Sequence, residues 1–416
     1  MNVRKEEVAA LRELAKRYME VASLPIQREK MELWKKFNRN DRSRPMVTIN
    51  QLPWHELAVE QDFQRCGVQG FLGDIESNMI SALYKWKHFP VDMVVEPYLN
   101  IGYSVTNSGY GIEAQEHTLS NDTKNNIVSH QFINQFETMD DVEKIKDIKI
   151  TLDEESSKER MEIAHEIFDG IIPVYQSGGT HIRLAIWDIL AECMNVESIY
   201  YTLLDEPELI HAIMERMTHS ALSGIEQCNN LGLFNTSSND CHCSITYTDE
   251  LLPDFLGGIG ADSYHSWSCS MAQVFTSASP SITKEFEIDY MSKISEKFGK
   301  FYYGCCERLD DRLDIIEQLP NLTKVSCSPW SNRDAFAEKL SKHLIMSAKP
   351  SPSLIISPDF DEASIRADLI KTCEAAKRND RNVELLFKDV STILYQPERL
   401  TKWANIAMEV AEQYGV

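Results

Sequence analysis

Residues 301–308 join an apolar, aromatic run to two adjacent cysteines and a carboxylate, in the order Phe-Tyr-Tyr-Gly-Cys-Cys-Glu-Arg. The run up to Tyr303 has the pattern of a buried strand. Cys305, Cys306 and Glu307 follow where this strand ends, so a ligand can reach them. Thiolates and carboxylates are ligands that zinc accepts, which makes the segment a candidate metal site. The alternative is that both cysteines are small core residues. Adjacent side chains on a strand point to opposite faces, so at most one thiol faces the strand end while the chain stays extended.

The elements that would position these groups alternate along the second half of the chain. Short apolar segments, such as 324–327 and 383–387, alternate with amphipathic segments, such as 362–378 and 397–414. This alternation is typical of an α/β fold with a parallel sheet and helices outside it. A count of about eight such units, with no glycine-rich phosphate loop after a strand, favours a (β/α)8 TIM barrel over a doubly wound sheet.

The whole chain, 1–416, is expected to form a single barrel domain. Residues 1–45 include charged and apolar positions at helical spacing and predict an N-terminal helical extension. Residues 102–135 are polar and irregular and predict an excursion over the main body. Residues 242–246 are expected to form a strand, with Cys241 and Cys243 on one face and His242 on the other.

Polar and soft side chains follow many of the predicted strands. In a TIM barrel, the chemistry lies at the carboxyl ends of the strands, so these side chains are the candidate site. The predicted catalytic residues are Glu307, Asp389 and Lys388, the predicted metal ligands are Cys305, Cys306 and Cys269, and the predicted substrate contacts are Trp267, Tyr303, Trp330, Lys349 and His242. The alternative for Lys388 and Asp389 is a structural ion pair, and for the aromatic residues it is ordinary packing.

The composition limits the partners and the compartment. The 64 acidic residues against 42 basic ones give a net charge of −22, which repels nucleic acid and anionic lipid. We therefore expect no nucleic-acid and no membrane partner, and no apolar run approaches the ~20 residues of a membrane span. The charged N-terminus does not resemble a signal peptide, and ten scattered cysteines fit a reduced cytoplasm better than a disulfide scaffold. A homodimer is compatible with the helix-rich surface.

Several short motifs occur in a fixed order through most of the chain. They are Arg44-Pro45-Met46-Val47, Pro53-Trp54-His55-Glu56, Asn126-Ile127-Val128-Ser129-His130, Thr248-Asp249-Glu250-Leu251, Tyr303-Gly304-Cys305-Cys306-Glu307, Asp310, Arg312, Pro320-Asn321-Leu322, Val325-Ser326-Cys327-Ser328-Pro329-Trp330, Ser347-Ala348-Lys349-Pro350-Ser351-Pro352 and Phe387-Lys388-Asp389. In this ordered set the chain resembles the uroporphyrinogen decarboxylase superfamily. It is most similar to the corrinoid-dependent methyltransferases of O-demethylation systems.

The resemblance implies a β/α barrel with a funnel-shaped active site and a zinc ion that activates the methyl donor or acceptor. It also implies an enzyme that moves a methyl group from a small methoxylated or methylated substrate to the cobalt of a separate corrinoid protein. A Lewis acid would stabilise the charge that develops on the ether oxygen, and the corrinoid cofactor would carry the difficult step. Two alternatives remain open: a decarboxylase or lyase on the same barrel, and a metal-free relative that binds a small molecule.

The chain departs from the family pattern at several positions. The tetrapyrrole decarboxylases carry an arginine-rich, glycine-containing N-terminal motif, and only Arg42-Ser43-Arg44-Pro45 stands here, which disfavours uroporphyrinogen decarboxylation. The thiol-activating methyltransferases carry a His-x-Cys pair where this chain has Tyr303-Gly304-Cys305. Met271 and Ser391 stand where relatives have an acidic residue and a histidine. The metal site is therefore either rebuilt from Cys269, Cys305 or Cys306, or absent.

Overall fold

Parallel strands form the centre of the protein. The computed structural model describes residues 4–119, 129–178, 184–234, 240–251 and 261–415. Six strands pair in parallel in the order β1 (Met46–Ile49), β14 (Val383–Phe387), β13 (Ile345–Ala348), β12 (Leu322–Cys327), β11 (Lys300–Tyr303) and β10 (Trp267–Ser270). Two more, β2 (Leu99–Gly102) and β7 (Val174–Ser177), form a separate parallel pair. Within the described ranges no hydrogen-bonded pairing joins the two sheets. The α/β class with a mainly parallel sheet is confirmed, whereas a closed TIM barrel stays a prediction.

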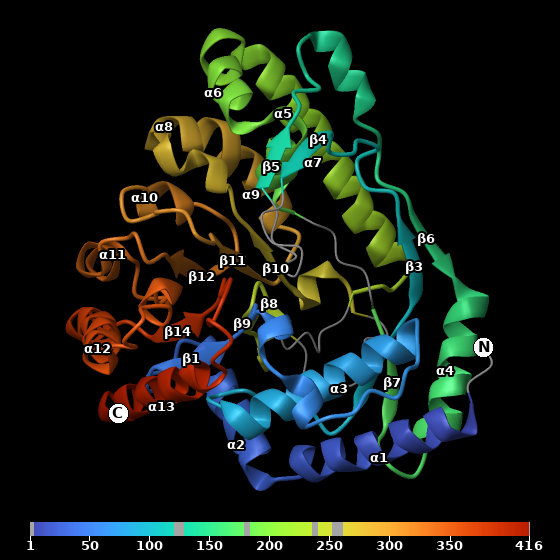
Figure 1. Ribbon diagram of the computed structural model, residues 1–416. Helices are drawn as coiled ribbons and strands as arrows, with labels where there is room; N and C mark the ends of the chain where they lie inside the picture. The colour runs from blue at the N-terminus through green and yellow to red at the C-terminus, as the bar shows by residue number, and fades with distance from the viewer. Residues whose placement is uncertain (1–3, 120–128, 179–183, 235–239, 252–260, 416) are drawn as a thin grey trace.

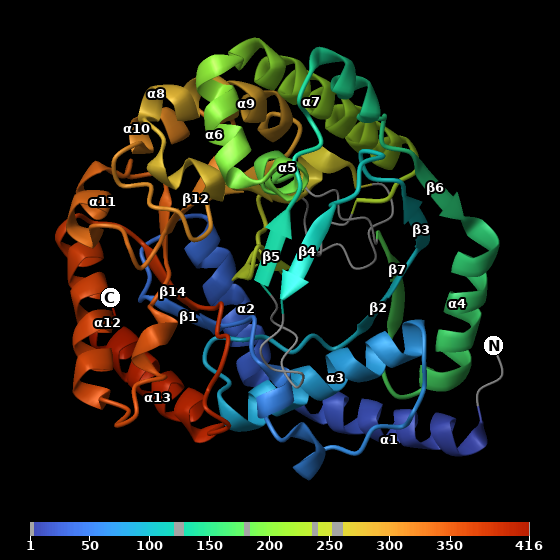
Figure 2. The ribbon, with the colours of Figure 1, turned by 45° about the horizontal axis from the view of Figure 1, so that its top comes forward.

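Helices surround these strands, with β1 and β14 on one side of the ring and β2 and β7 on the other (Figure 2). The predicted N-terminal extension consists of α1 (Lys5–Ala22) and α2 (Pro25–Asn38), which lie along the lower edge of the molecule in Figure 1. The remaining helices are α3 (Phe71–His88), α4 (Glu154–Phe168), α5 (Ile186–Met194), α6 (Val196–Asp205), α7 (Pro207–Asn230), α8 (Pro280–Thr283), α9 (Asp289–Ser295), α10 (Leu313–Ile316), α11 (Arg333–Lys339), α12 (Glu362–Arg378) and α13 (Glu398–Gln413). No described helix is both long enough and apolar enough to span a membrane.

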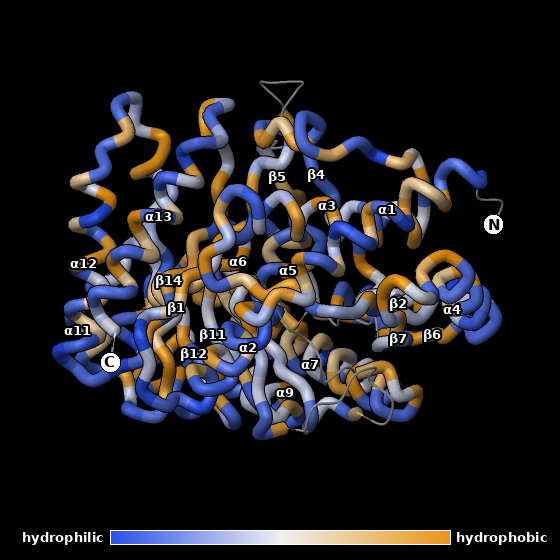
Figure 3. The backbone as a smooth tube through the Cα atoms, turned by 90° about the horizontal axis from the view of Figure 1, so that it is seen from below, coloured by the Kyte–Doolittle hydropathy of each residue, from blue (hydrophilic) through white to orange (hydrophobic). Residues whose placement is uncertain are grey.

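Helix α12 illustrates how the sequence fixes these elements. The carboxylate of Asp361 accepts hydrogen bonds from the backbone N–H groups of Ala363 and Ser364 and so caps the helix start. Hydrophobic and hydrophilic residues alternate along the helix in Figure 3. Ile365, Leu369 and Cys373 are buried, as expected of a helix with one face against the sheet.

The six-stranded sheet has one apolar face and one face that combines polar side chains with apolar ones such as Met46 and Ile345. Side chains alternate between faces along a strand, and partners in register share a face. The apolar face packs into the main hydrophobic core through Val47, Phe301, Tyr303, Val325, Met346, Leu385 and Phe387. The opposite face carries the side chains of Cys269, Tyr302, Lys324, Ser326, Ser347 and Glu384. We call this set the polar face, and all of its members except Cys269 are buried.

Two predictions about local structure need correction. The segment 242–246 is not a single strand but part of an antiparallel hairpin of β8 (Asp240–Cys241) and β9 (Ser244–Ile245). His242 and Cys243 form its turn with φ of 50° and 69°, so the expected alternation of faces does not apply to them.

The irregular segment 102–135 contains regular structure. Strand β3 (Ser104–Asn107) pairs with β6 (Ile150–Asp153), and β4 (Glu116–Leu119) pairs with β5 (Ser129–Phe132), both antiparallel. The β4–β5 ribbon extends over the middle of the ring in Figure 2. Residues 126–128 of the motif that ends at His130 lie outside the described residues.

A glycine shapes the turn after β11. Gly304 has φ of +95°, and a Cβ there would lie 2.5 Å from Leu309 Cδ1 and 3.0 Å from Ser326 Cβ. This backbone conformation is accessible to glycine and strained for other residues, and the space is filled as well. Glycine is therefore required for the chain to leave the strand direction at this position.

We expect Gly304→Ala to lower the free energy of unfolding by about 2–4 kcal/mol, because a backbone penalty and an overpacking penalty act together. Gly170→Ala is the matched control, since Gly170 has φ of +79° with nothing within 4 Å of its added Cβ. Chemical denaturation of both variants measures the difference. Equal losses in the two variants would show that the packing around Gly304 contributes nothing.

Candidate active site

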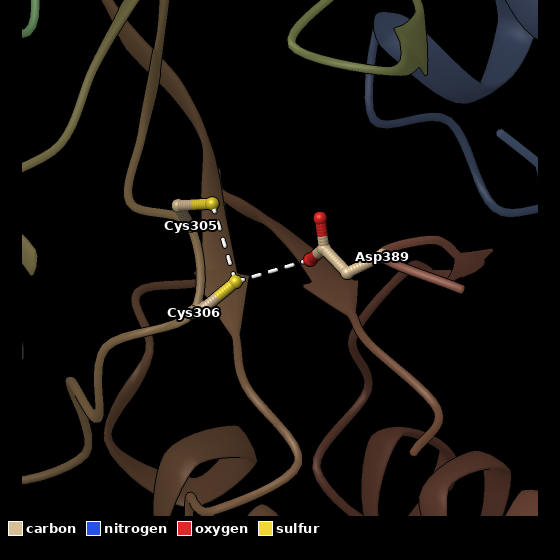
Figure 4. A group of neighbouring side chains, drawn as sticks. All are labelled: Cys305, Cys306 and Asp389. Carbon is tan, nitrogen blue, oxygen red and sulfur yellow. Dashed lines mark hydrogen bonds between the residues drawn. The ribbon is translucent and has the colours of Figure 1, made fainter. Parts of the chain in front are cut away.

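The turn at Gly304 brings two adjacent thiols together. Cys305 Sγ and Cys306 Sγ lie 3.4 Å apart, and Cys306 Sγ donates to Asp389 Oδ2 at 3.1 Å (Figure 4). Asp389 directly follows Lys388 after β14 and has φ of 58°, so a second turn with positive φ points its carboxylate at the thiols. On an extended strand the two adjacent thiols would point to opposite faces. The chain is not extended after Gly304, so both thiols can face the same side.

Lys388 offsets part of the negative charge of this group. Its Nζ donates to Cys305 Sγ at 3.2 Å and lies 3.4 Å from Asp389 Oδ2. Burial alone would lower the pKa of Lys388, but the Cys305 thiolate and the Asp389 carboxylate raise it above its ordinary value. The lysine therefore remains protonated beside the thiols.

The two thiols have opposite protonation tendencies. The hydrogen bond from Cys306 lowers the pKa of Cys305 well below that of a free thiol; burial opposes this shift, and His242 and Lys388 add to it. The same hydrogen bond raises the pKa of Cys306, together with burial and Asp389. These shifts favour Cys305 as the thiolate of the pair, while Cys306 keeps its proton.

Glu307 and Ser326 hold the thiol turn in place. Glu307 Oε2 accepts from the backbone N–H of Cys305 at 2.8 Å, and Ser326 Oγ donates to the carbonyl oxygen of Cys305 at 2.6 Å. Burial raises the pKa of Glu307 to about 7. Its other oxygen, Oε1, is buried and has no hydrogen-bond partner among the described residues. Glu307 therefore acts first as a positioning residue for Cys305.

Beneath the thiols, the polar face is crossed by a completely buried ion pair. Lys324 Nζ lies 3.3 Å from Glu384 Oε2 and donates to Ser244 Oγ at 2.7 Å. Ser244 Oγ in turn donates to the same Glu384 oxygen at 2.8 Å. Ser244 belongs to the β8–β9 hairpin, so this network fastens the hairpin across the polar face. The hairpin turn places the ring of His242 5.5 Å from the ring of Tyr302.

Lys349 stands on the same face, directly after β13. Its Nζ contacts Tyr302 Oη and donates to Ser347 Oγ at 2.7 Å and to the carbonyl oxygen of Ser347 at 3.2 Å. Burial lowers the pKa of Lys349 to about 8. The predicted residues Cys305, Cys306, Glu307, Lys388, Asp389, His242 and Lys349 are thus gathered at the carboxyl ends of β11, β13 and β14.

The other four predicted residues are placed differently. Cys269 packs against the same small hydrophobic cluster as Cys305 and Cys306, but its thiol hydrogen-bonds with Cys241 and is not one of the three donors that lie within 4.8 Å of one another. Tyr303 points to the helix side, where its hydroxyl donates to Glu287 Oε1 at 3.3 Å. Trp267 is buried at the amino end of β10, opposite Lys300, and Trp330 is 76% exposed.

Sequence reasoning missed the residues of the polar network. Lys324 and Glu384 are charged residues in the middle of apolar strands, which is the signal that could have revealed them. Glu287 was also missed; it lies on a π-helical turn, Lys284–Ile288, and burial raises its pKa well above that of an ordinary carboxyl. Such turns often occur at functional sites.

The group formed by Cys305, Cys306 and Asp389 suits zinc. Within the described residues it is the one set of three or more candidate donors whose ligand atoms all lie within 4.8 Å of one another. Two sulfurs and one carboxylate oxygen are a donor set that zinc accepts, and three protein ligands leave a fourth position open for a substrate. The Cys305 thiolate is already in the form that a metal ligand must take.

Comparisons with known proteins bear on the fold. No protein-family model matches the chain, and no curated protein matches it in sequence. Among solved structures, a methyltransferase from Methanosarcina mazei aligns with 92% of this chain and 98% of its own, with a TM-score of 0.51 and 9% sequence identity. At this identity the likeness shows a shared fold over nearly the whole chain.

We expect Lys388→Met to raise the pKa of Cys305 by about 1–3 units, because an adjacent positive charge favours the thiolate by this amount. The ultraviolet absorbance of the thiolate, followed through a pH titration and compared with Cys305→Ser, measures the shift in metal-free protein. Lys293→Met is the control, since Lys293 pairs with Glu215 on the surface. An unchanged titration would show that Lys388 does not stabilise this thiolate.

Proposed function

We propose that the protein is a zinc-assisted methyltransferase that moves a methyl group from a small methoxylated or methylated substrate to the cobalt of a separate corrinoid protein. The observation that carries the proposal is the convergence of Cys305, Cys306 and Asp389 at the carboxyl edge of the parallel sheet. The fold shared with a methyltransferase supports it, as does the ordered set of family motifs. The ten cysteines are free thiols, which fits the cytoplasm that we propose as the compartment.

Some residues of this chain would bind the zinc ion, and others position its ligands. Cys305, Cys306 and Asp389 would hold the zinc ion, which when bound supplies a Lewis acid for the oxygen or sulfur that carries the methyl group. Lys388 keeps Cys305 deprotonated and offsets part of the negative charge of the ligands. Glu307 fixes the backbone of Cys305, and the buried polar face excludes bulk water from below.

Metal analysis tests the ligand set. We expect about one zinc ion per chain in protein purified without chelator, and loss of that zinc in Cys305→Ser, Cys306→Ser and Asp389→Asn. Cys269→Ser is the matched control and is expected to retain zinc, because the thiol of Cys269 pairs with Cys241. A wild-type protein that takes up no zinc even when zinc is added would favour a metal-free relative that binds a small molecule.

Methyl transfer itself is tested with free, reduced cobalamin as the acceptor and a panel of methoxylated and methylated compounds. We expect at least one compound to give methylated cobalamin, read from its visible spectrum, with a rate reduced at least about tenfold in Asp389→Asn. Zinc bound at the predicted ligands, but no transfer from any compound to free cobalamin or to a corrinoid protein, would contradict the proposed reaction and leave the metal site intact.

A further inference from the structure

The adjacent thiols of Cys305 and Cys306 are placed to react with each other. Their sulfur atoms lie 3.4 Å apart, and both side chains are free thiols. Figure 4 shows the two sulfurs close together at the turn, with the Asp389 carboxylate next to Cys306. An S–S bond of about 2 Å requires only a small movement of the two side chains. The pair therefore has the geometry for a disulfide as well as for a metal ion.

Cys305 has the surroundings of a reactive cysteine. Lys388 Nζ donates to its sulfur at 3.2 Å, and a neighbouring cation favours the thiolate, which is the nucleophilic form of cysteine. Cys305 is 5% exposed and Cys306 is partly exposed, so a small oxidant has better access to the pair than a bulky one. Because oxidation follows thiolate character and access, a peroxide is the class of oxidant that fits these surroundings.

Cys306 is placed to complete the reaction. Its thiol donates to Asp389 Oδ2 at 3.1 Å, so a carboxylate is in position to take the proton when the sulfur attacks. The peptide bond between the two cysteines is trans, which holds their Cα atoms about 3.8 Å apart. This separation is shorter than in most disulfides, so a bond between these sulfurs is strained and easily reduced.

Other thiols in the protein have less reactive surroundings. Cys241 and Cys269 form a second pair, and Cys269 packs against the same small cluster as the first pair. The hydrogen bond to Cys269, together with burial, raises the pKa of Cys241 well above that of an ordinary thiol. Burial and Glu76 raise the pKa of the partly exposed Cys66 to about 12. Cys241 and Cys66 are therefore weak nucleophiles at neutral pH.

We infer that Cys305 and Cys306 form a redox-sensitive dithiol that a peroxide oxidises to an intramolecular disulfide and that a thiol reductant restores. The Cys305 thiolate attacks one peroxide oxygen, the O–O bond breaks, and hydroxide leaves while Cys305 becomes a sulfenic acid. The Cys306 sulfur then attacks the Cys305 sulfur and the S–O bond breaks. The Cys306 proton passes through Asp389 to the leaving hydroxide, which becomes water. The two cysteines lose two electrons in all, and the peroxide gains them.

The consequence for zinc rests on the proposed function. A disulfide removes two of the three proposed ligands, because a metal ligand must be a thiolate. Oxidation would then release the metal and stop methyl transfer, and reduction would allow the site to reload. The formation of the disulfide itself needs no metal.

Oxidation of chelator-treated protein tests the inference. Hydrogen peroxide is added to the full chain, the remaining thiols are alkylated under denaturing conditions, and the peptide that contains both cysteines is analysed by mass spectrometry. We expect this peptide to lose two hydrogens and to escape alkylation, and we expect dithiothreitol to restore both thiols. Cys66→Ser is the control and should form the same disulfide as the wild type.

Two variants separate the steps. Cys306→Ser lacks the second thiol, so Cys305 should stop at the sulfenic acid, which dimedone traps. Lys388→Met removes the cation next to Cys305 and should slow disulfide formation at least about tenfold, because less of the thiol is then ionised.

The decisive measurement uses the wild type, so poor folding of a variant does not affect it. A peptide that keeps both thiols after peroxide treatment, a disulfide between Cys241 and Cys269 in its place, or an oxidation that dithiothreitol does not reverse would overturn the inference. In zinc-loaded protein, a chromogenic chelator should detect zinc release in step with disulfide formation. Disulfide formation in a protein that never binds zinc would support the dithiol and contradict the proposed function alone.

Discussion

The buried ion pair between Lys324 and Glu384 is the interaction on which the interior of this protein depends. Lys324 on β12 and Glu384 on β14 are completely buried, and β13 lies between their strands. An unpaired charge at this depth would be strongly destabilising. Ser244 completes the network and connects it to the β8–β9 hairpin. The sheet therefore keeps a polar face inside the molecule, and the hairpin that carries His242 is held against it.

A polar interior of this kind positions the site above it. Alternation along β11 to β14 sends apolar side chains such as Val325 and Phe387 to the helices and sends charged ones inward. Where the strands end, the same alternation delivers Lys349 and Lys388 to the inner side. The candidate site thus continues the polar face. Its charged pair of Lys388 and Asp389 lies on the same side of the sheet as the ion pair of Lys324 and Glu384.

Two turns with positive φ complete the group. They lie at Gly304, where glycine adopts this conformation without strain, and at Asp389, and they direct two thiols and a carboxylate toward one point. At Asp389, a residue other than glycine, this conformation persists only where the surrounding contacts enforce it. Here Glu307 and Ser326 hold the thiol turn from both sides of Cys305.

By itself, the sequence determined the alternation of strands and helices in the second half, including β14 and α12, and the position of Cys305, Cys306, Lys388 and Asp389 directly after strands. These features follow from local periodicity and from the tendency of parallel strands to end at one edge. Only the tertiary structure decided that the Asp389 carboxylate contacts the Cys306 thiol, that Tyr303 faces the helices, and that His242 lies in a turn. The physical reason is that these choices depend on register between distant strands and on positive φ at particular residues, and neither leaves a periodic signal in the chain.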